Sequence, residues 1–230
     1  MAMANLSPRL LAVANLVPQC SVVADIGTDH AYVPIYLVEN KVADFAIASD
    51  VVEGPAMRAK ENIARHNLSD KIDVRIGNGL EKVNGADVII IAGMGGKLIC
   101  DIISEGRPII DKAQMLILQP MTAIYEVRRF LHINNFTITD EHLAQEDEKV
   151  YNIMVVKSGS EIIDDDIYYH IGKKLVDNKD KLLKKYIDKK VHSLDVMTQN
   201  MSNSDDISLS KKMAKIVALK QRFLQIGGSL

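Results

Sequence analysis

The sequence of 230 residues contains no tryptophan, six prolines and two cysteines. Cys20 and Cys100 lie far apart and form no CxxC pair, so neither a disulfide scaffold nor a thiolate metal site is expected. No apolar run approaches the roughly 20 residues that span a bilayer, and the N-terminus lacks the pattern of a secretory signal. These absences predict a soluble protein of the reducing cytoplasm, with no metal and no membrane segment.

The net charge of -2 conceals an asymmetry along the chain. Residues 1–156 carry 14 basic and 20 acidic side chains, whereas residues 157–230 carry 14 basic and 10 acidic ones. Two regions of opposite sign suggest two different tasks. We therefore expect one domain at residues 1–158 and a second at residues 159–230.

Short apolar runs alternate with amphipathic helical patterns in the first region. Continuous apolar runs are typical of parallel strands that are covered on both faces. Repeated strand–helix units predict a doubly wound α/β domain. The predicted strands are residues 21–25, 45–49, 72–76, 88–92 and 115–119, and the predicted helices between them are residues 32–39, 55–66, 97–105 and 124–133.

Both ends of this region carry further signals. Ser7 followed by Pro8 predicts the start of an N-terminal helix. Residues 136–142 and 150–156 predict two closing strands joined by an exposed acidic loop at residues 145–149. The resulting sheet has seven strands, most of them parallel.

The second region is helical in character, with many lysines and no proline between residues 164 and 224. A polar break at residues 202–206 separates two helical patterns, which predicts an antiparallel helical hairpin. The heptad spacing is irregular, so a regular coiled coil and a looser hairpin both stay open. The apolar positions of the first helix are Ile171, Leu175, Leu182, Tyr186, Leu194, Met197 and Met201.

Polar and glycine-rich residues follow each predicted parallel strand. In an open α/β sheet, ligands bind at these carboxyl ends, near the point where the strand order reverses. The residues at the successive strand ends are Asp25, Gly27 and Asp29, then Asp50 and Val51, then Asn78 and Gly79, then Gly93 and Met94, and finally Gln119.

The first of these turns argues against a dinucleotide. Gly27 is one glycine where the GxGxxG motif has three, and Asp29 stands where a pyrophosphate would bind and would repel it. Asp50 follows the second predicted strand. In nucleoside-binding α/β sheets an acid at this position accepts hydrogen bonds from two ribose hydroxyls. A nucleoside with a positive charge fits better, which favours S-adenosylmethionine (SAM) over NAD and predicts a methyltransferase.

Five separated motifs between about Leu6 and Val156 closely resemble the bacterial tRNA (adenine-N1)-methyltransferases that modify adenine 22 in the D-arm. Two positions depart from that pattern: Asp50 stands where a glutamate is frequent, and Asn152 where a glutamate often follows the tyrosine. The motifs are DIGTDHAYVP at 25–34, GP at 54–55, NGL at 78–80, IAGMGG at 91–96 and LILQP at 116–120.

The resemblance implies a Rossmann-like class I methyltransferase domain followed by a helical, coiled-coil-like tail that binds tRNA. It implies SAM as cofactor, S-adenosylhomocysteine (SAH) as product, and no metal, and we expect a monomer. Under this hypothesis Asp29 stabilises the cationic product or takes the exocyclic amine proton, directly or through His30. The other expected residues are Asp25, Gly27, Asp50, Val51, Asn78, Gly79, Gly93 and Met94 for the cofactor, and Arg9, Tyr32, Gln119, Lys184 and Lys185 for the tRNA.

Simpler interpretations stay open for several of these residues. Asp29 is also a typical helix cap, Tyr32 fits core packing as well as stacking on a flipped adenine, and Arg9 and the tail lysines fit a solvated helix face. Alternative functions are a methyltransferase with another acceptor and a non-catalytic module that binds SAM. An NAD-dependent oxidoreductase is disfavoured by the missing glycines.

Overall fold

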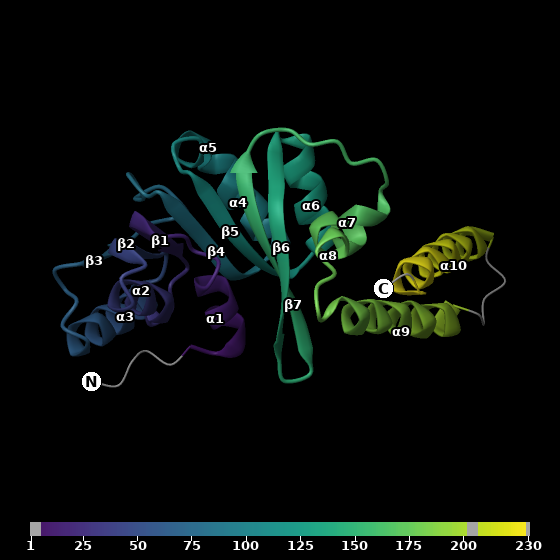
Figure 1. Ribbon diagram of the computed structural model, residues 1–230, viewed down its shortest axis with the longest axis horizontal. Coiled ribbons are helices and arrows are strands. Elements are labelled where there is room, and N and C mark those ends of the chain that lie inside the picture. Colours follow the sequence, from purple (N-terminus) through teal and green to yellow (C-terminus); the bar gives the residue numbers. More distant parts are fainter. Residues whose placement is uncertain (1–5, 202–206, 229–230) are drawn as a thin grey trace. The chain divides into compact units, whose positions relative to one another are not determined.

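A seven-stranded sheet forms the centre of the first part of the chain in the computed structural model (Figure 1). Its strand order is β3-β2-β1-β4-β5-β7-β6, with β1 to β5 parallel and β7 antiparallel to both β5 and β6. The order reverses between β1 and β4, which opens a crevice at their carboxyl ends. The strands are β1 (Cys20–Ile26), β2 (Ala43–Asp50), β3 (Ile72–Ile76), β4 (Val88–Gly95), β5 (Met115–Thr122), β6 (Phe136–Glu146) and β7 (Lys149–Ser158).

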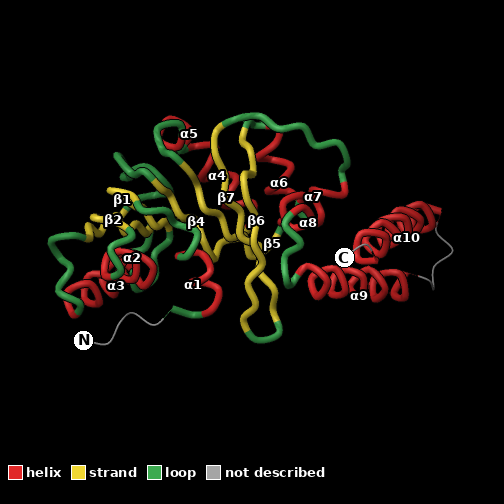
Figure 2. Tube along the Cα trace, viewed as in Figure 1, coloured by secondary structure: helices red, strands yellow, loops and turns green. Residues whose placement is uncertain are grey.

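Helices cover both faces of this sheet (Figure 2). Successive residues of a strand point to opposite faces, so Ile90 packs into one core and Ile89 and Ile91 into the other. This two-sided burial explains the continuous apolar runs, and the predicted doubly wound fold is confirmed. One face carries α1 (Pro8–Ala14), α2 (Tyr32–Glu39) and α3 (Glu53–Arg65), and the other carries α4 (Gly96–Glu105), α5 (Arg107–Ile110) and α6 (Ile124–Ile133).

The closing strands β6 and β7 are longer than the sequence predicts. The predicted acidic, exposed loop at residues 145–149 is shorter than expected: Glu146 pairs with Lys149, and only the exposed residues Asp147, with φ 52°, and Glu148 form the turn. The extended hairpin reaches α1 (Figure 1). Ser7 Oγ lies 2.6 Å from Glu146 Oε2. Ser7 is the N-cap of α1, as predicted.

The structure describes residues 6–201 and 207–228, and the chain divides into two compact units, residues 1–162 and 163–230. In these ranges no helix has the length and apolar character needed to cross a membrane. The second unit contains α7 (Ile167–Ile171), α8 (Lys173–Asp177), α9 (Leu183–Met201) and α10 (Ile207–Gly228).

The predicted hairpin is present as α9 and α10. Ile187 lies beside Gly227 and Asp195 pairs with Lys220, so the two helices run in opposite directions. The first helix of the hairpin, α9, begins at Leu183, later than expected. Gly172, with φ 99°, separates the short helices α7 and α8, and a second break, at which Lys179 has φ 49°, separates α8 from α9. The predicted break at residues 202–206 lies outside the described residues.

Candidate active site

A cavity of about 210 Å³ lies at the carboxyl ends of β1 and β4. Six residues to which the sequence analysis gives a role line it, and so do four residues to which it gives none. Those four are Leu10, Thr28, Val33 and Ala92, of which the last three lie within the quoted motifs at 25–34 and 91–96. The predicted residues are Arg9, Asp25, Gly27, Asp29, Tyr32 and Gly93.

Asp25 is a carboxylate buried at the end of β1, with 8% of its surface exposed. Burial raises the pKa of Asp25 to about 6, and the nearby charge of Asp50 acts in the same direction. An acid that is costly to ionise in this position favours a cationic ligand, which would compensate its charge. The site therefore fits a positively charged molecule.

Gly27 brings the backbone of the first turn close to the end of β4. It has φ 74°, and a Cβ on this residue would lie 2.1 Å from Cε of Met94. The amide nitrogens of Gly27 and Thr28 both donate to the carbonyl oxygen of Ser49, at 2.8 and 3.0 Å. This turn is thus fixed to the end of β2 on one side and packed against Met94 on the other.

The segment after Gly27 is strained. His30 and Ala31 have φ 65° and 54°, an uncommon pair of left-handed residues outside glycine. The side chain of Asn62 supports this turn by donating to the carbonyl of His30 at 2.8 Å. Ala31 is the N-cap of α2 and its helix end has no side-chain cap, which excludes the interpretation of Asp29 as a capping residue.

Asp29 instead forms a polar contact with α3. Its Oδ1 lies 3.0 Å from Nη2 of Arg58 and 3.5 Å from Nε2 of His30. The His30 ring stacks on Tyr32 with centroids 5.3 Å apart. Tyr32 is 41% exposed, which argues against a role in core packing. Asp29, His30 and Tyr32 therefore form one group at the rim of the cavity.

The ends of β2 and β3 meet beside this turn without lining the cavity. Asp50 Oδ1 accepts a hydrogen bond from the amide of Val52 at 2.8 Å, and the side chain of Val51 is exposed. The carbonyl of Asp50 accepts from the amide of Gly77 at 3.0 Å. This bond holds the Asn78-Gly79 turn next to Asp50.

Gln119 lies behind the cavity and is fully buried. Its Oε1 accepts hydrogen bonds from Arg9 Nη1 at 2.6 Å and from the Gly93 amide at 3.2 Å. Its Nε2 donates to the carbonyl of Pro120 at 3.1 Å. The polar atoms of Gln119 are thus engaged by the protein itself.

Asn152 belongs to a buried network rather than to the cavity. Its Oδ1 accepts from Arg128 Nη2 at 2.8 Å, and Arg128 Nε lies 2.7 Å from Glu141. Both members of this ion pair are 2% exposed. Asn152 therefore has a structural contact in this chain.

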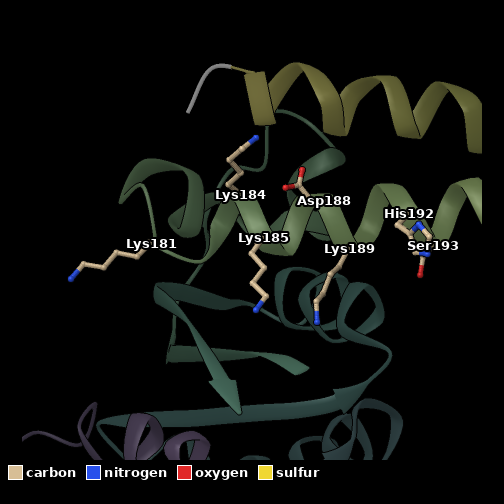
Figure 3. Close-up of a pocket in the computed structure, with 7 residues that line it drawn as sticks. All are labelled: Lys181, Lys184, Lys185, Asp188, Lys189, His192 and Ser193. Atoms are coloured by element: carbon tan, nitrogen blue, oxygen red, sulfur yellow. The ribbon is translucent and has the colours of Figure 1, made fainter. Parts of the chain in front are cut away.

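Lys184 and Lys185 lie on α9, in the second unit. They line an open surface hollow with Lys181, Lys189 and His192, and Lys185 and Lys189 extend to the same side of the helix (Figure 3). In the described part of the chain, no group of three or more histidine, cysteine, aspartate or glutamate side chains is placed to hold a metal ion.

Comparisons with known proteins agree in one family. A family model described as tRNA (adenine(22)-N(1))-methyltransferase matches residues 23–222. The chain is 35% identical to the tRNA (adenine(22)-N(1))-methyltransferase of Bacillus subtilis (strain 168), over 96% of both chains. It is similar to the structure of the B. subtilis m1A22 tRNA methyltransferase TrmK, with 31% identity, a TM-score of 0.87 and coverage of 97% of this chain and 99% of that one.

A second solved structure contains the cofactor product. M. capricolum TrmK, in complex with SAH, is 27% identical and has a TM-score of 0.82. The similarity covers 98% of this chain and 99% of that one.

Proposed function

This chain belongs to the tRNA (adenine(22)-N(1))-methyltransferase family, and on that premise we propose that it methylates N1 of adenine 22 in tRNA with SAM as methyl donor. The observation that carries the proposal is the cavity where the strand order reverses, with the buried carboxylate of Asp25 beside Gly27. A cationic nucleoside fits this charge, whereas the pyrophosphate of NAD does not.

The residues around the crevice fit the parts of SAM. Asp50 has a carboxylate for the ribose hydroxyls, and Val51 offers an exposed apolar side chain beside it. Asn78 and Gly79 lie next to Asp50 at the end of β3, where the adenine ring would be held. Gly27, Gly93 and Met94 form the backbone wall between β1 and β4.

Methyl transfer requires the protein to position adenine N1 against the methyl group more than to activate it. Bound SAM supplies an electrophilic methyl group on a sulfonium. Adenine N1 carries a free lone pair at neutral pH and needs no activation. The protein therefore has to hold N1 in line with the methyl group and to stabilise the positive charge that develops on the base. Unstacking the target base from folded tRNA costs about a few kcal/mol, and the exposed ring of Tyr32 offers a stacking surface for it.

We assign the catalytic role to Asp29 and His30. The methylated base is cationic, and the Asp29 carboxylate at the cavity rim is placed to stabilise it or to accept the exocyclic amine proton. His30 lies between Asp29 and Tyr32: its Nε2 is 3.5 Å from Asp29 Oδ1, and its ring stacks on the Tyr32 ring.

The direct test is methylation of unmodified tRNA transcripts. We expect methyl incorporation from labelled SAM and a primer-extension stop at adenine 22, because N1-methyladenine blocks the Watson–Crick edge. A transcript with guanine at position 22 is the control. Incorporation without a stop at that position would refute the target, and absence of incorporation with SAH binding intact would refute catalysis on tRNA.

For the second unit we propose a tRNA-binding role through the basic face of α9. Counterion release makes such binding salt-dependent. Replacing Lys184 and Lys185 together by glutamine should weaken tRNA binding several-fold and leave SAH affinity unchanged. The slope of log affinity against log salt concentration should decrease in magnitude by about one to two. The control replaces the exposed residues Lys41 and Lys112 of the first unit. Equal tRNA affinity in both double variants would contradict the proposal.

We also propose that the protein acts as a monomer in the cytoplasm. Light scattering of the purified protein with and without tRNA tests the first point. A dimer mass at low micromolar concentration would overturn it.

A further inference from the structure

Arg58 of α3 is an exposed arginine beside the rim group of Asp29, His30 and Tyr32. Its Nη2 donates to Asp29 Oδ1 at 3.0 Å. One helical turn further on, Asn62 donates to the carbonyl of His30 at 2.8 Å. Residues four apart lie on one face of a helix, so α3 holds the strained turn at two points. Arg58 is therefore kept next to the rim of the cavity, although it is not among the residues that line it.

Most of the hydrogen-bonding capacity of the Arg58 guanidinium is unused. An arginine has five N–H donors in a planar fork, and in the described part of the chain Asp29 is the one acceptor that they reach. The Arg58 side chain is 48% exposed. A Cβ at Gly54 would lie 3.7 Å from Nη1, so this end of the fork borders an exposed glycine. Donors therefore remain for a second acceptor that comes from outside the protein.

The location of this ion pair matters more than its effect on the fold. Ion pairs between exposed side chains contribute little to stability, because water screens them and two side chains lose their freedom. The mouth of the crevice is rich in carboxylates, with Asp25 and Asp29 in the cavity lining and Asp50 beside it. These charges repel an approaching polyanion. An exposed cation on Asp29 offsets this repulsion at the point where RNA has to enter.

A base that is flipped out of folded RNA brings its own backbone to the rim of the pocket. The exposed ring of Tyr32 offers the stacking surface for the base, and contacts run from it through His30 and Asp29 to Arg58. We propose that Arg58 binds a phosphate next to the target adenine while one of its N–H groups stays on Asp29. The planar fork of arginine suits phosphate oxygens. This inference rests on the proposed function, because it takes a flipped adenine of tRNA as the substrate.

The first test removes the charge by Arg58→Met. We expect KM and Kd for tRNA to rise about threefold to tenfold, as for a charged contact that is partly exposed to water. The kcat should change by less than about twofold, because the exposed ion pair holds Asp29 only weakly. SAH affinity should not change, because Arg58 does not line the cavity. Arg58→Lys should recover most of the lost tRNA affinity, since lysine binds phosphate as a point charge.

The matched control is Arg65→Met, in the last turn of the same helix. Arg65 is 74% exposed and its Nη2 lies 3.7 Å from Glu61 Oε2, so it too is an exposed arginine in an ion pair. This variant should bind and methylate tRNA normally, and an equal loss in both variants would overturn the proposal. A fall in kcat with an unchanged KM in Arg58→Met would make Arg58 a positioning residue for Asp29 and would also overturn it.

The second test identifies the phosphate. It uses tRNA assembled with one neutral methylphosphonate linkage on the 5′ or the 3′ side of adenine 22. One of the two linkages should weaken binding to the unaltered protein by the same factor as Arg58→Met and should have no further effect on that variant, because the contact is already lost. Losses that add for both linkages would refute the phosphate contact. If the unaltered protein methylated no tRNA at all, the proposed function itself would be refuted.

Discussion

Replacing Asp25 by asparagine should stabilise the ligand-free protein while it impairs cofactor binding. Burial raises the pKa of Asp25 from an ordinary value of 3.8 to about 6, so at pH 7.5 the folded protein carries a carboxylate that the fold disfavours. A shift of about two pKa units at about 1.4 kcal/mol each costs about 3 kcal/mol. Asparagine has no charge to bury, and its Tm should be about 5–10 °C higher.

The sign of this effect depends on pH. Because the pKa is raised in the folded state, the folded protein takes up its proton first as the pH falls. The stability contributed by that proton is complete below the unfolded pKa near 4 and is lost as the pH rises through about 6. The advantage of Asp25→Asn should therefore be full at pH 7.5 and close to zero at pH 4. The charged neighbours in the cavity, Arg9 and Asp29, and Asp50 beside it, stay unchanged in this comparison.

Thermal unfolding at pH 4, 6 and 7.5, with and without SAH, measures both effects. The unaltered protein should gain stability from SAH, about 4 kcal/mol at a thousandfold excess over Kd, and Asp25→Asn should gain much less. Asp101→Asn, an exposed aspartate of α4, is the control. An asparagine variant no more stable than the unaltered protein at pH 7.5, or a difference that does not shrink at pH 4, would refute the reasoning.

Three further changes have defined outcomes. Asp50→Ala should weaken SAH binding by about 1–3 kcal/mol through the loss of charged hydrogen bonds to the ribose, and calorimetry with an unchanged Kd would reject this role. Asp29→Ala should abolish tRNA methylation and leave the protein folded, with a Tm near that of the unaltered protein, so normal turnover would remove Asp29 from catalysis. Arg128→Met should cost about 3–5 kcal/mol of unfolding free energy, because it removes the cation that pairs with the buried Glu141 carboxylate; denaturant titration showing less than about 1 kcal/mol would count against this account.

The sequence predicts the parallel part of the sheet well, for a physical reason. Residues 88–92 are apolar without interruption because the two faces of β4 both lie in a core. The β6–β7 hairpin was predicted too short, because its charged tip residues Glu146 and Lys149 pair through backbone atoms and leave no apolar alternation to detect. Gly172 interrupts the tail by its left-handed conformation, which helical periodicity does not reveal.

In the candidate site, the residues that follow predicted strands could be recognised from the sequence, whereas contacts that depend on side-chain packing could not. Asp25, Gly27 and Gly93 are recognisable because they follow predicted strands, and the fold brings parallel strand ends together. The position of Arg9 could not be predicted, because helical spacing does not tell which way α1 faces the sheet. Gln119 was recognised as a crevice residue, but its buried contacts to Arg9 and Gly93 depend on side-chain geometry across β4 and β5.

The contact between Ser7 and Glu146 has a consequence for the order in which the protein can be completed. Arg9 precedes all its anchors, Gln119, Glu146 and Tyr151, by more than a hundred residues. During synthesis, a chain that extends through β4 already contains the strand ends that line the crevice. The residues that hold the Arg9 side chain have not yet been made. The cavity becomes complete only when the last hairpin of the sheet closes on α1.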